Sequence, residues 1–131
     1  MRGISVSKPK YLLDTNVVIW WLLHHPRISD ELINTIQTNE VCVSMISLWE
    51  ITIKKQIKKL SLSKDLLQAI NGSHFRLVNL NVQDFDNLGT LPFHHRDPFD
   101  RIIIAQAITE GLTIITSDRI FKQYPVDILK I

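Results

Sequence analysis

An acid, a hydroxyl and an amide stand side by side in an otherwise apolar stretch near the N-terminus, in the segment YLLDTNVVIWWLL. These residues are Asp14, Thr15 and Asn16. Burying an unpaired carboxylate is costly, so such an acid is normally hydrogen-bonded, paired or bound to a metal. We therefore expect Asp14 to belong to a polar site, with Thr15 and Asn16 orienting its carboxylate.

Four further acids occupy comparable positions. Asp118 follows the apolar run LTIIT, Glu50 follows the run EVCVS, and Asp97 and Asp100 flank a Pro-Phe pair. Carboxylates that converge raise each other's pKa unless a cation lies among them, and Mg²⁺ and Mn²⁺ are the ions that prefer carboxylate oxygen. Metal ions held in this way activate water and offset charge on a leaving oxygen, so the pattern favours phosphodiester hydrolysis.

Each of these acids also has a structural interpretation. Glu50 completes an S-x-x-E capping box, which is the favoured interpretation of that residue taken alone. Asp97 precedes a proline and is best explained as a helix N-cap, while Asp100 fits a first-turn acid and Asp118 a turn residue. Apolar runs along the chain predict a parallel sheet, and none of these interpretations explains why all the acids fall on one edge of it.

Apolar runs rich in β-branched residues alternate with helical patterns along the chain. The runs predict strands at 11–13, 40–44, 75–80, 112–116 and 126–131. The patterns between them predict helices at 16–23, about 30–38, 47–59, 64–71, 82–88 and 98–110, the last closed by Gly111. This order predicts an α/β fold with three α/β/α layers and a mainly parallel sheet of about five strands. Ligands bind beyond the carboxyl ends of such strands, where Thr116 and Ser117 would orient Asp118.

Composition favours a soluble protein of one domain spanning residues 1–131. Hydrophobic residues make up 45% of the chain, enough for a core, and the formal net charge of +2 is compatible with nucleic-acid binding without establishing it. Cys42 is the single cysteine and lies in an apolar run, so we expect it to be buried and expect no disulfide framework. The apolar runs are far shorter than the roughly 20 residues of a membrane helix, and we expect a cytoplasmic location.

Three segments resemble a PIN domain, and specifically the VapC-like toxin ribonucleases of type II toxin–antitoxin pairs. They read YLLDTNVVIWWL, VSMISLWEITIKKQIKKL and HHRDPFDRIIIAQAITEGLTIITSDRIFKQY, and with their spacing they span nearly the whole chain. The acidic quartet of that family falls on Asp14, Glu50, Asp100 and Asp118. Asp97 is an additional acid, for which a ligand, a water-mediated contact and a simple helix cap all stay open.

The resemblance implies a function and a set of partners. It implies an endoribonuclease that uses Mg²⁺ or Mn²⁺, forms a homodimer, and is inhibited by an antitoxin peptide laid across the active-site groove.

Basic residues and histidines are harder to interpret. Arg101 and Arg119 directly follow two of the proposed metal ligands, and either they bind substrate phosphate or they form internal ion pairs that balance the acids. Histidine pairs occur at 24–25 and 94–95, but adjacent residues rarely chelate one ion, so we do not expect a histidine metal site.

Two other functions compete with the metal nuclease. An aspartyl phosphotransfer domain would use Asp14 as a nucleophile, but the second acid of its D-x-D pattern is replaced here by Asn16. A non-catalytic PIN-like module would keep the fold only to bind a protein or RNA, and the intact acidic quartet argues against it.

Overall fold

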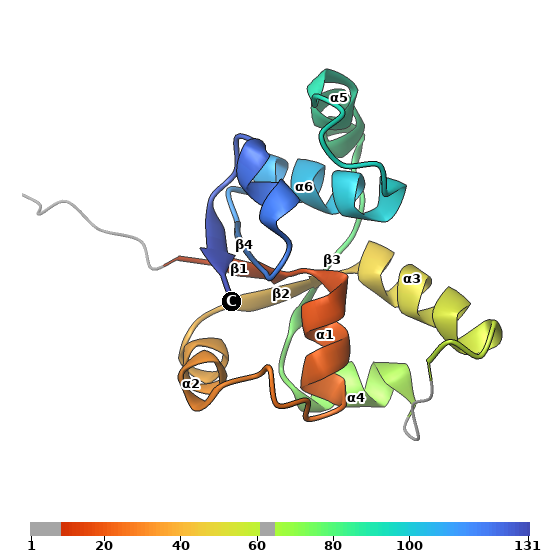
Figure 1. The fold of residues 1–131 in the computed structure, drawn as a ribbon, viewed down its shortest axis with the longest axis vertical. Helices are drawn as coiled ribbons and strands as arrows, with labels where there is room; N and C mark the ends of the chain where they lie inside the picture. The colour runs from red at the N-terminus through yellow and green to blue at the C-terminus, as the bar shows by residue number, and fades with distance from the viewer. Residues whose placement is uncertain (1–8, 61–64) are drawn as a thin grey trace, which may run out of the picture.

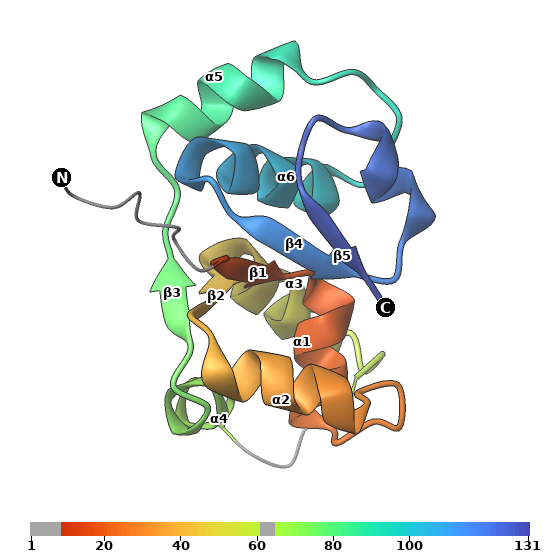
Figure 2. The same cartoon turned by 90° about the vertical axis from the view of Figure 1, so that its left-hand side faces the viewer.

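A parallel sheet forms the middle of the molecule (Figures 1 and 2). The computed structural model describes residues 9–60 and 65–131. Its strands lie in the order β3-β2-β1-β4-β5, and all four neighbouring pairs are parallel. The five strands are β1 (Tyr11–Leu13), β2 (Val41–Ser44), β3 (Arg76–Val78), β4 (Thr113–Thr116) and β5 (Ile128–Lys130). The predicted five-stranded α/β/α fold is confirmed.

Helices cover both faces of this sheet. The α5 and α6 helices lie on one face and α1, α2 and α4 on the other, while α3 contacts both α1 and α6 (Figure 2). Their bounds are α1 (Thr15–Leu22), α2 (Asp30–Thr38), α3 (Met45–Gln56), α4 (Leu66–Gly72), α5 (Val82–Thr90), α6 (Pro98–Glu110) and the 3₁₀ helix η1 (Arg119–Gln123). The predicted helix 64–71 corresponds to α4, and its first residue lies outside the described residues. None of the helices in the described ranges is long and apolar enough to cross a membrane.

Alternate residues of each central strand pack into different cores. Leu12 and Ile114 are fully buried beneath α6, whereas Leu13 and Ile115 are fully buried in the cluster that includes α1 and α2. A strand covered on both faces has no solvent-facing side, which is why these segments are uniformly apolar. Cys42 is also fully buried, as expected.

The connections of the sheet place a topological switch point beside β1. The chain passes from β1 to β2 on one side, whereas β4 pairs with β1 on the other, so the strand order reverses between β1 and β4. The Asp14 N–H donates to the Ile115 carbonyl at 3.0 Å and ties the two strand ends together. Ligands of open α/β sheets bind at such a switch point, and the first acid of the sequence lies there.

Candidate active site

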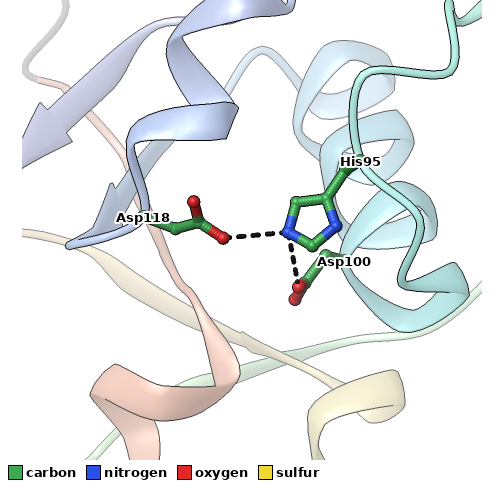
Figure 3. Close-up of side chains that lie close together, drawn as sticks. All are labelled: His95, Asp100 and Asp118. Carbon is green, nitrogen blue, oxygen red and sulfur yellow. Dashed lines mark hydrogen bonds and ion pairs between the residues drawn. The ribbon is translucent and has the colours of Figure 1, made fainter.

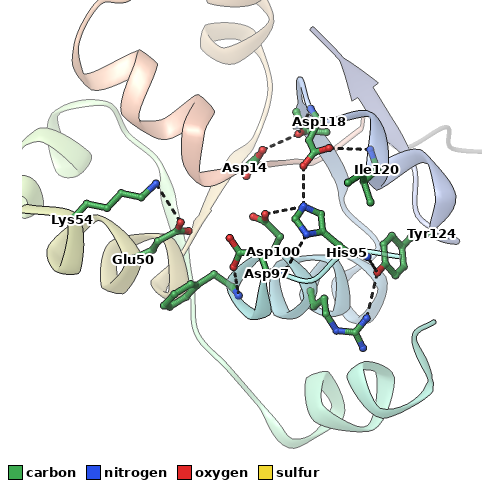
Figure 4. A network of polar contacts seen from close by, with 12 residues as sticks. Asp14, Glu50, Lys54, His95, Asp97, Asp100, Asp118, Ile120 and Tyr124 are labelled. Carbon is green, nitrogen blue, oxygen red and sulfur yellow. Dashed lines mark hydrogen bonds and ion pairs between the residues drawn. The ribbon is translucent and has the colours of Figure 1, made fainter. Parts of the chain in front are cut away.

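Asp14 lies buried at the carboxyl end of β1. It occupies the N-cap position of α1, but within the described structure its side chain makes no capping hydrogen bond. Instead its Oδ2 accepts a hydrogen bond of 2.8 Å from Thr116 Oγ1, at the end of β4 (Figure 4). The carboxylate is therefore aimed along the edge of the sheet by a neighbouring strand.

The surroundings of Asp14 disfavour its charge. Burial raises its pKa to about 6, although the hydrogen bonds from Thr116 and from the Thr15 backbone act in the opposite direction. The charges of Glu50 and Asp118 raise the pKa further. A cation placed among these carboxylates would favour the ionised form of each.

Glu50 does not cap its helix, so the capping-box interpretation is wrong. Ser44 is the N-cap of α3, because its Oγ accepts from the Ile46 N–H at 3.0 Å, and the helix begins at Met45. Glu50 is thus in the second turn of α3, where its Oε2 lies 3.3 Å from Lys54 Nζ. Its Oε1 is buried and has no hydrogen-bond partner among the described residues.

The hydroxyl of Thr15 has a different partner from the one expected. Thr15 Oγ1 and Ser47 Oγ form a buried hydrogen bond of 2.9 Å, which joins the start of α1 to the start of α3. The side chain of Thr15 therefore fixes the helix that carries Glu50, and only its backbone assists Asp14. Asn16 is exposed, and its role in orienting Asp14 stays a prediction.

Two acids lie at the start of α6. Asp97 is the N-cap, since its Oδ1 accepts from the Phe99 N–H at 2.9 Å and Pro98 takes the first helical position. The cap interpretation of Asp97 is confirmed. Asp100 follows in the first turn, with its side chain 16% exposed.

The pKa of Asp100 is raised further than that of Asp14. Burial raises its pKa to about 8, and the negative charges of its neighbours raise it further, with contributions from Asp14, Asp97, Glu50 and Asp118. Its ionised form is therefore disfavoured when no cation is present. The acids predicted from the sequence thus share one electrostatic neighbourhood (Figure 4).

Asp118 is both a turn residue and a member of the cluster. Its Oδ1 accepts from the Ile120 N–H at 2.9 Å and caps η1. Its own N–H donates to Thr116 Oγ1 at 3.0 Å, so Thr116 contacts Asp118, the acid it is expected to orient, and also Asp14, for which the sequence predicts other partners. Ser117 is half-buried, and the role expected for it stays a prediction.

A histidine that the sequence interpretation set aside lies in the same cluster. His95 Nε2 is 2.8 Å from Asp118 Oδ2 and 3.1 Å from Asp100 Oδ2 (Figure 3). The three side chains offer atoms that all lie within 4.8 Å of one another. Adjacent histidines rarely chelate one ion, which is why the sequence predicts no histidine metal site at 94–95. The overlooked signal is that His95 stands two residues before the N-cap Asp97.

The two arginines lie in contrasting environments. Arg101 is buried, donates to the Pro92 carbonyl at 2.7 Å and to Tyr124 Oη at 3.3 Å, and stacks over Phe93 at 4.1 Å. These contacts favour a structural role over both roles expected for it, phosphate binding and an ion pair with the acids. Arg119 is exposed beside Asp118, so phosphate binding stays a prediction for this residue.

This donor set fits a hard divalent cation. The carboxylates of Asp14, Glu50, Asp100 and Asp118 supply the oxygen ligands that Mg²⁺ and Mn²⁺ prefer. A cation would also satisfy the buried Glu50 Oε1 and offset the repulsion that raises the pKa of Asp14 and Asp100. The arrangement can therefore hold an ion and orient water and phosphate around it.

A separate cavity of about 530 Å³ lies near the amino ends of β2 and β3, whereas the acids lie at the carboxyl ends of the strands. Its lining includes Trp21 from α1, Ile36 from α2 and Phe75 just before β3. None of the acids of the cluster lines this cavity. This cavity is therefore separate from the acid cluster.

Comparisons with known proteins agree with this geometry. Residues 11–127 match the family model of the PIN domain. The chain is 28% identical over 117 residues to "Ribonuclease VapC22" of Mycobacterium tuberculosis, an alignment that covers 86% of this chain and 90% of the relative.

Two solved structures share the fold. DNA-bound VapBC from Salmonella typhimurium superposes with a TM-score of 0.70 and 23% identity, covering 94% of this chain and 98% of the other. VapBC2 from Rickettsia felis, bound to a promoter DNA fragment, gives a TM-score of 0.69 and 22% identity, covering 92% and 98%. With a family match over most of its length and an acid cluster at the switch point of its sheet, this chain belongs to the PIN domain family.

Proposed function

We propose that this protein is a metal-dependent endoribonuclease that hydrolyses RNA phosphodiester bonds. The carrying observation is that Asp14 and Asp100 have raised pKa values in a cluster with Glu50 and Asp118, an arrangement that a divalent cation would balance. The name of the relative, Ribonuclease VapC22, supports RNA as the substrate.

Four acids would hold the ion, which we propose to be Mg²⁺ or Mn²⁺: Asp14, Glu50, Asp100 and Asp118. When bound, the ion lowers the pKa of a water and offsets charge on the leaving oxygen. Around it, Thr116 orients two of the acids, and exposed Arg119 binds the substrate phosphate beside Asp118. Asp97 caps α6 through Oδ1 and adds negative charge near Asp100, and its further role as a direct ligand or a water-mediated contact of the ion stays a prediction.

We further propose that the chain is the toxin of a type II toxin–antitoxin pair. The solved structures of similar fold are titled as VapBC assemblies, which supports an antitoxin protein as the partner. We also propose that the protein forms a homodimer and is located in the cytoplasm. Expression of the wild-type chain should arrest cell growth, whereas expression of Asp14→Asn should not, and sedimentation of the purified protein should report a dimer.

Cleavage of a mixed cellular RNA pool tests the enzymatic function. The wild-type chain would be assayed with Mg²⁺, with Mn²⁺ and with EDTA, beside Asp14→Asn and Asp100→Asn. Asp86→Asn is the matched control, because it makes the same chemical change at an exposed acid of α5.

We expect discrete RNA fragments from the wild type and from Asp86→Asn, and loss of cleavage by at least about 100-fold in the two cluster variants and in EDTA. The ends of the RNA fragments would identify the target sequence. Cleavage that persists in EDTA would contradict the metal dependence. An absence of both cleavage and metal binding would favour a non-catalytic module that binds a protein or RNA.

A further inference from the structure

His95 lies between two acids of the cluster. Its Nε2 is within hydrogen-bond distance of both Asp118 Oδ2 and Asp100 Oδ2, and its side chain is 12% exposed. This arrangement has two chemical interpretations. Either Nε2 carries a hydrogen and donates it to the carboxylates, or Nε2 carries a lone pair and is itself a metal ligand beside Asp100 and Asp118.

The other ring nitrogen distinguishes these interpretations. The backbone N–H of Asp97 donates to His95 Nδ1 at 3.1 Å. A backbone N–H can only donate, so Nδ1 must carry a lone pair, and the single hydrogen of the neutral ring is then on Nε2. A hydrogen on Nδ1 would face the Asp97 N–H, which would leave two part-buried donors opposed and unsatisfied.

The ring is also held firmly in this orientation. The His95 backbone N–H donates to Tyr124 Oη at 2.7 Å, and the imidazole packs edge-on against Phe121 with 5.7 Å between ring centres. Tyr124 and Phe121 both belong to the segment that follows Asp118. The segment that follows Asp118 therefore also positions His95.

We propose that His95 is a positioning residue of the metal site and is not a metal ligand. Its Nε2–H donates to Asp118 and Asp100 and orients their carboxylates toward the ion. The inference rests on the proposed metal-dependent function. Because a nitrogen that donates a hydrogen bond cannot coordinate, the ion receives oxygen ligands from the four acids, which favours Mg²⁺ and Mn²⁺ over Zn²⁺ and Ni²⁺.

The tautomer can be measured without metal or RNA. Protein labelled with ¹⁵N-histidine gives ring nitrogen signals by NMR, and the His95 signals are assigned by their loss in His95→Gln. We expect a hydrogen on Nε2, both in the metal-free protein and after addition of Mg²⁺. A hydrogen on Nδ1 with none on Nε2 would overturn the proposal whether or not the chain cleaves RNA.

Metal binding provides the second readout. With Mn²⁺ bound to the ¹⁵N-histidine protein, pulsed electron paramagnetic resonance should detect no coupling from a directly coordinated nitrogen. Such a coupling, if it is lost in His95→Phe, would identify His95 as a ligand and overturn the proposal.

Two substitutions separate positioning from ligation. His95→Phe keeps a ring against Phe121 but removes both nitrogens, and His95→Gln keeps an N–H near the place of Nε2. In calorimetric titrations we expect His95→Phe to weaken Mg²⁺ and Mn²⁺ binding equally, by about 10- to 100-fold, and His95→Gln to recover part of the loss. A much larger loss of Mn²⁺ binding than of Mg²⁺ binding, with no recovery in His95→Gln, would contradict the positioning role.

Discussion

Thr116 Oγ1 donates to Asp14 Oδ2 at 2.8 Å and joins the carboxyl ends of two strands that lie 102 residues apart in the sequence. The same oxygen accepts from the Asp118 N–H at 3.0 Å. A hydroxyl offers one donor and two acceptor sites, so a single side chain can orient both acids at once. The carboxylate of Asp14 is thereby fixed before any ligand binds.

Replacing Thr116 by valine should weaken both the fold and the activity. The substitution keeps the shape of the side chain but leaves the Asp14 carboxylate and the Asp118 N–H without this partner, which costs about 1–3 kcal/mol when groups are buried. Loss of a residue that orients metal ligands typically lowers affinity or activity by about 10- to 100-fold. Urea unfolding and RNA cleavage would measure the two effects. Thr116→Ser keeps the hydroxyl and should behave like the wild type; equal activity of the valine and serine variants would contradict the assigned role.

The fold could be predicted because its signals are local. Uniformly apolar runs such as 112–116 indicate strands buried on both faces, and the helical patterns between them require parallel crossovers. The convergence of Asp14 and Asp118 follows from this topology alone, since Asp14 directly follows β1 and Asp118 lies two residues after β4. These inferences needed no knowledge of side-chain contacts.

The remaining features of the site depend on contacts between distant segments. The Ser-x-x-Glu pattern indicated a helix start at residue 47, but the Ser44 hydroxyl begins the helix three residues earlier and moves Glu50 into its second turn. His95 lies in a loop, and its position is set by Tyr124 and Phe121, far along the chain. The sequence pattern of neither segment indicates which distant residues it contacts.

Stability of the metal-free protein should depend on pH through Asp100. The folded state holds its proton up to a pH of about 8, whereas the ordinary pKa is 3.8. Between these values the folded state binds more protons than the unfolded chain, so the free energy of unfolding falls as pH rises. Asp14, whose pKa is raised to about 6, acts in the same direction over the lower part of this range.

Asp100→Asn should remove this contribution and should be more stable than the wild type near pH 8 in EDTA. Urea midpoints measured at about pH 5 and about pH 8 would test the expectation. Asp86→Asn, at an exposed acid, should keep the wild-type dependence on pH. Parallel pH profiles for the wild type and Asp100→Asn would show that the Asp100 carboxyl is not perturbed.

Divalent cations should stabilise the folded chain. A ligand that binds only the folded state at about 100 times its dissociation constant adds about 2.7 kcal/mol to the free energy of unfolding. The thermal midpoint should therefore rise with Mg²⁺ or Mn²⁺ and return to its starting value with EDTA. Asp14→Asn and Glu50→Gln should reduce this shift, because each removes a proposed ligand. An unchanged shift in both variants would place the ion elsewhere.

The two arginines beside the acids should respond differently to substitution. Arg101 is buried, donates to the Pro92 carbonyl and Tyr124 Oη, and stacks over Phe93, so Arg101→Met leaves acceptors without their donor. We expect it to lower the free energy of unfolding by about 2–4 kcal/mol, within the range of large single-substitution effects. Arg119 is exposed, so Arg119→Ala should change stability by less than about 0.5 kcal/mol.

Cleavage kinetics complete the comparison. Arg119→Ala should raise the KM for RNA, because one phosphate contact is lost. The KM of this variant should also depend less on salt concentration than that of the wild type. Arg101→Met, assayed at a temperature where it stays folded, should retain the KM of the wild type, since its guanidinium bonds within the protein. The reverse result, a raised KM in Arg101→Met and an unchanged KM in Arg119→Ala, would show that the buried arginine reaches the substrate.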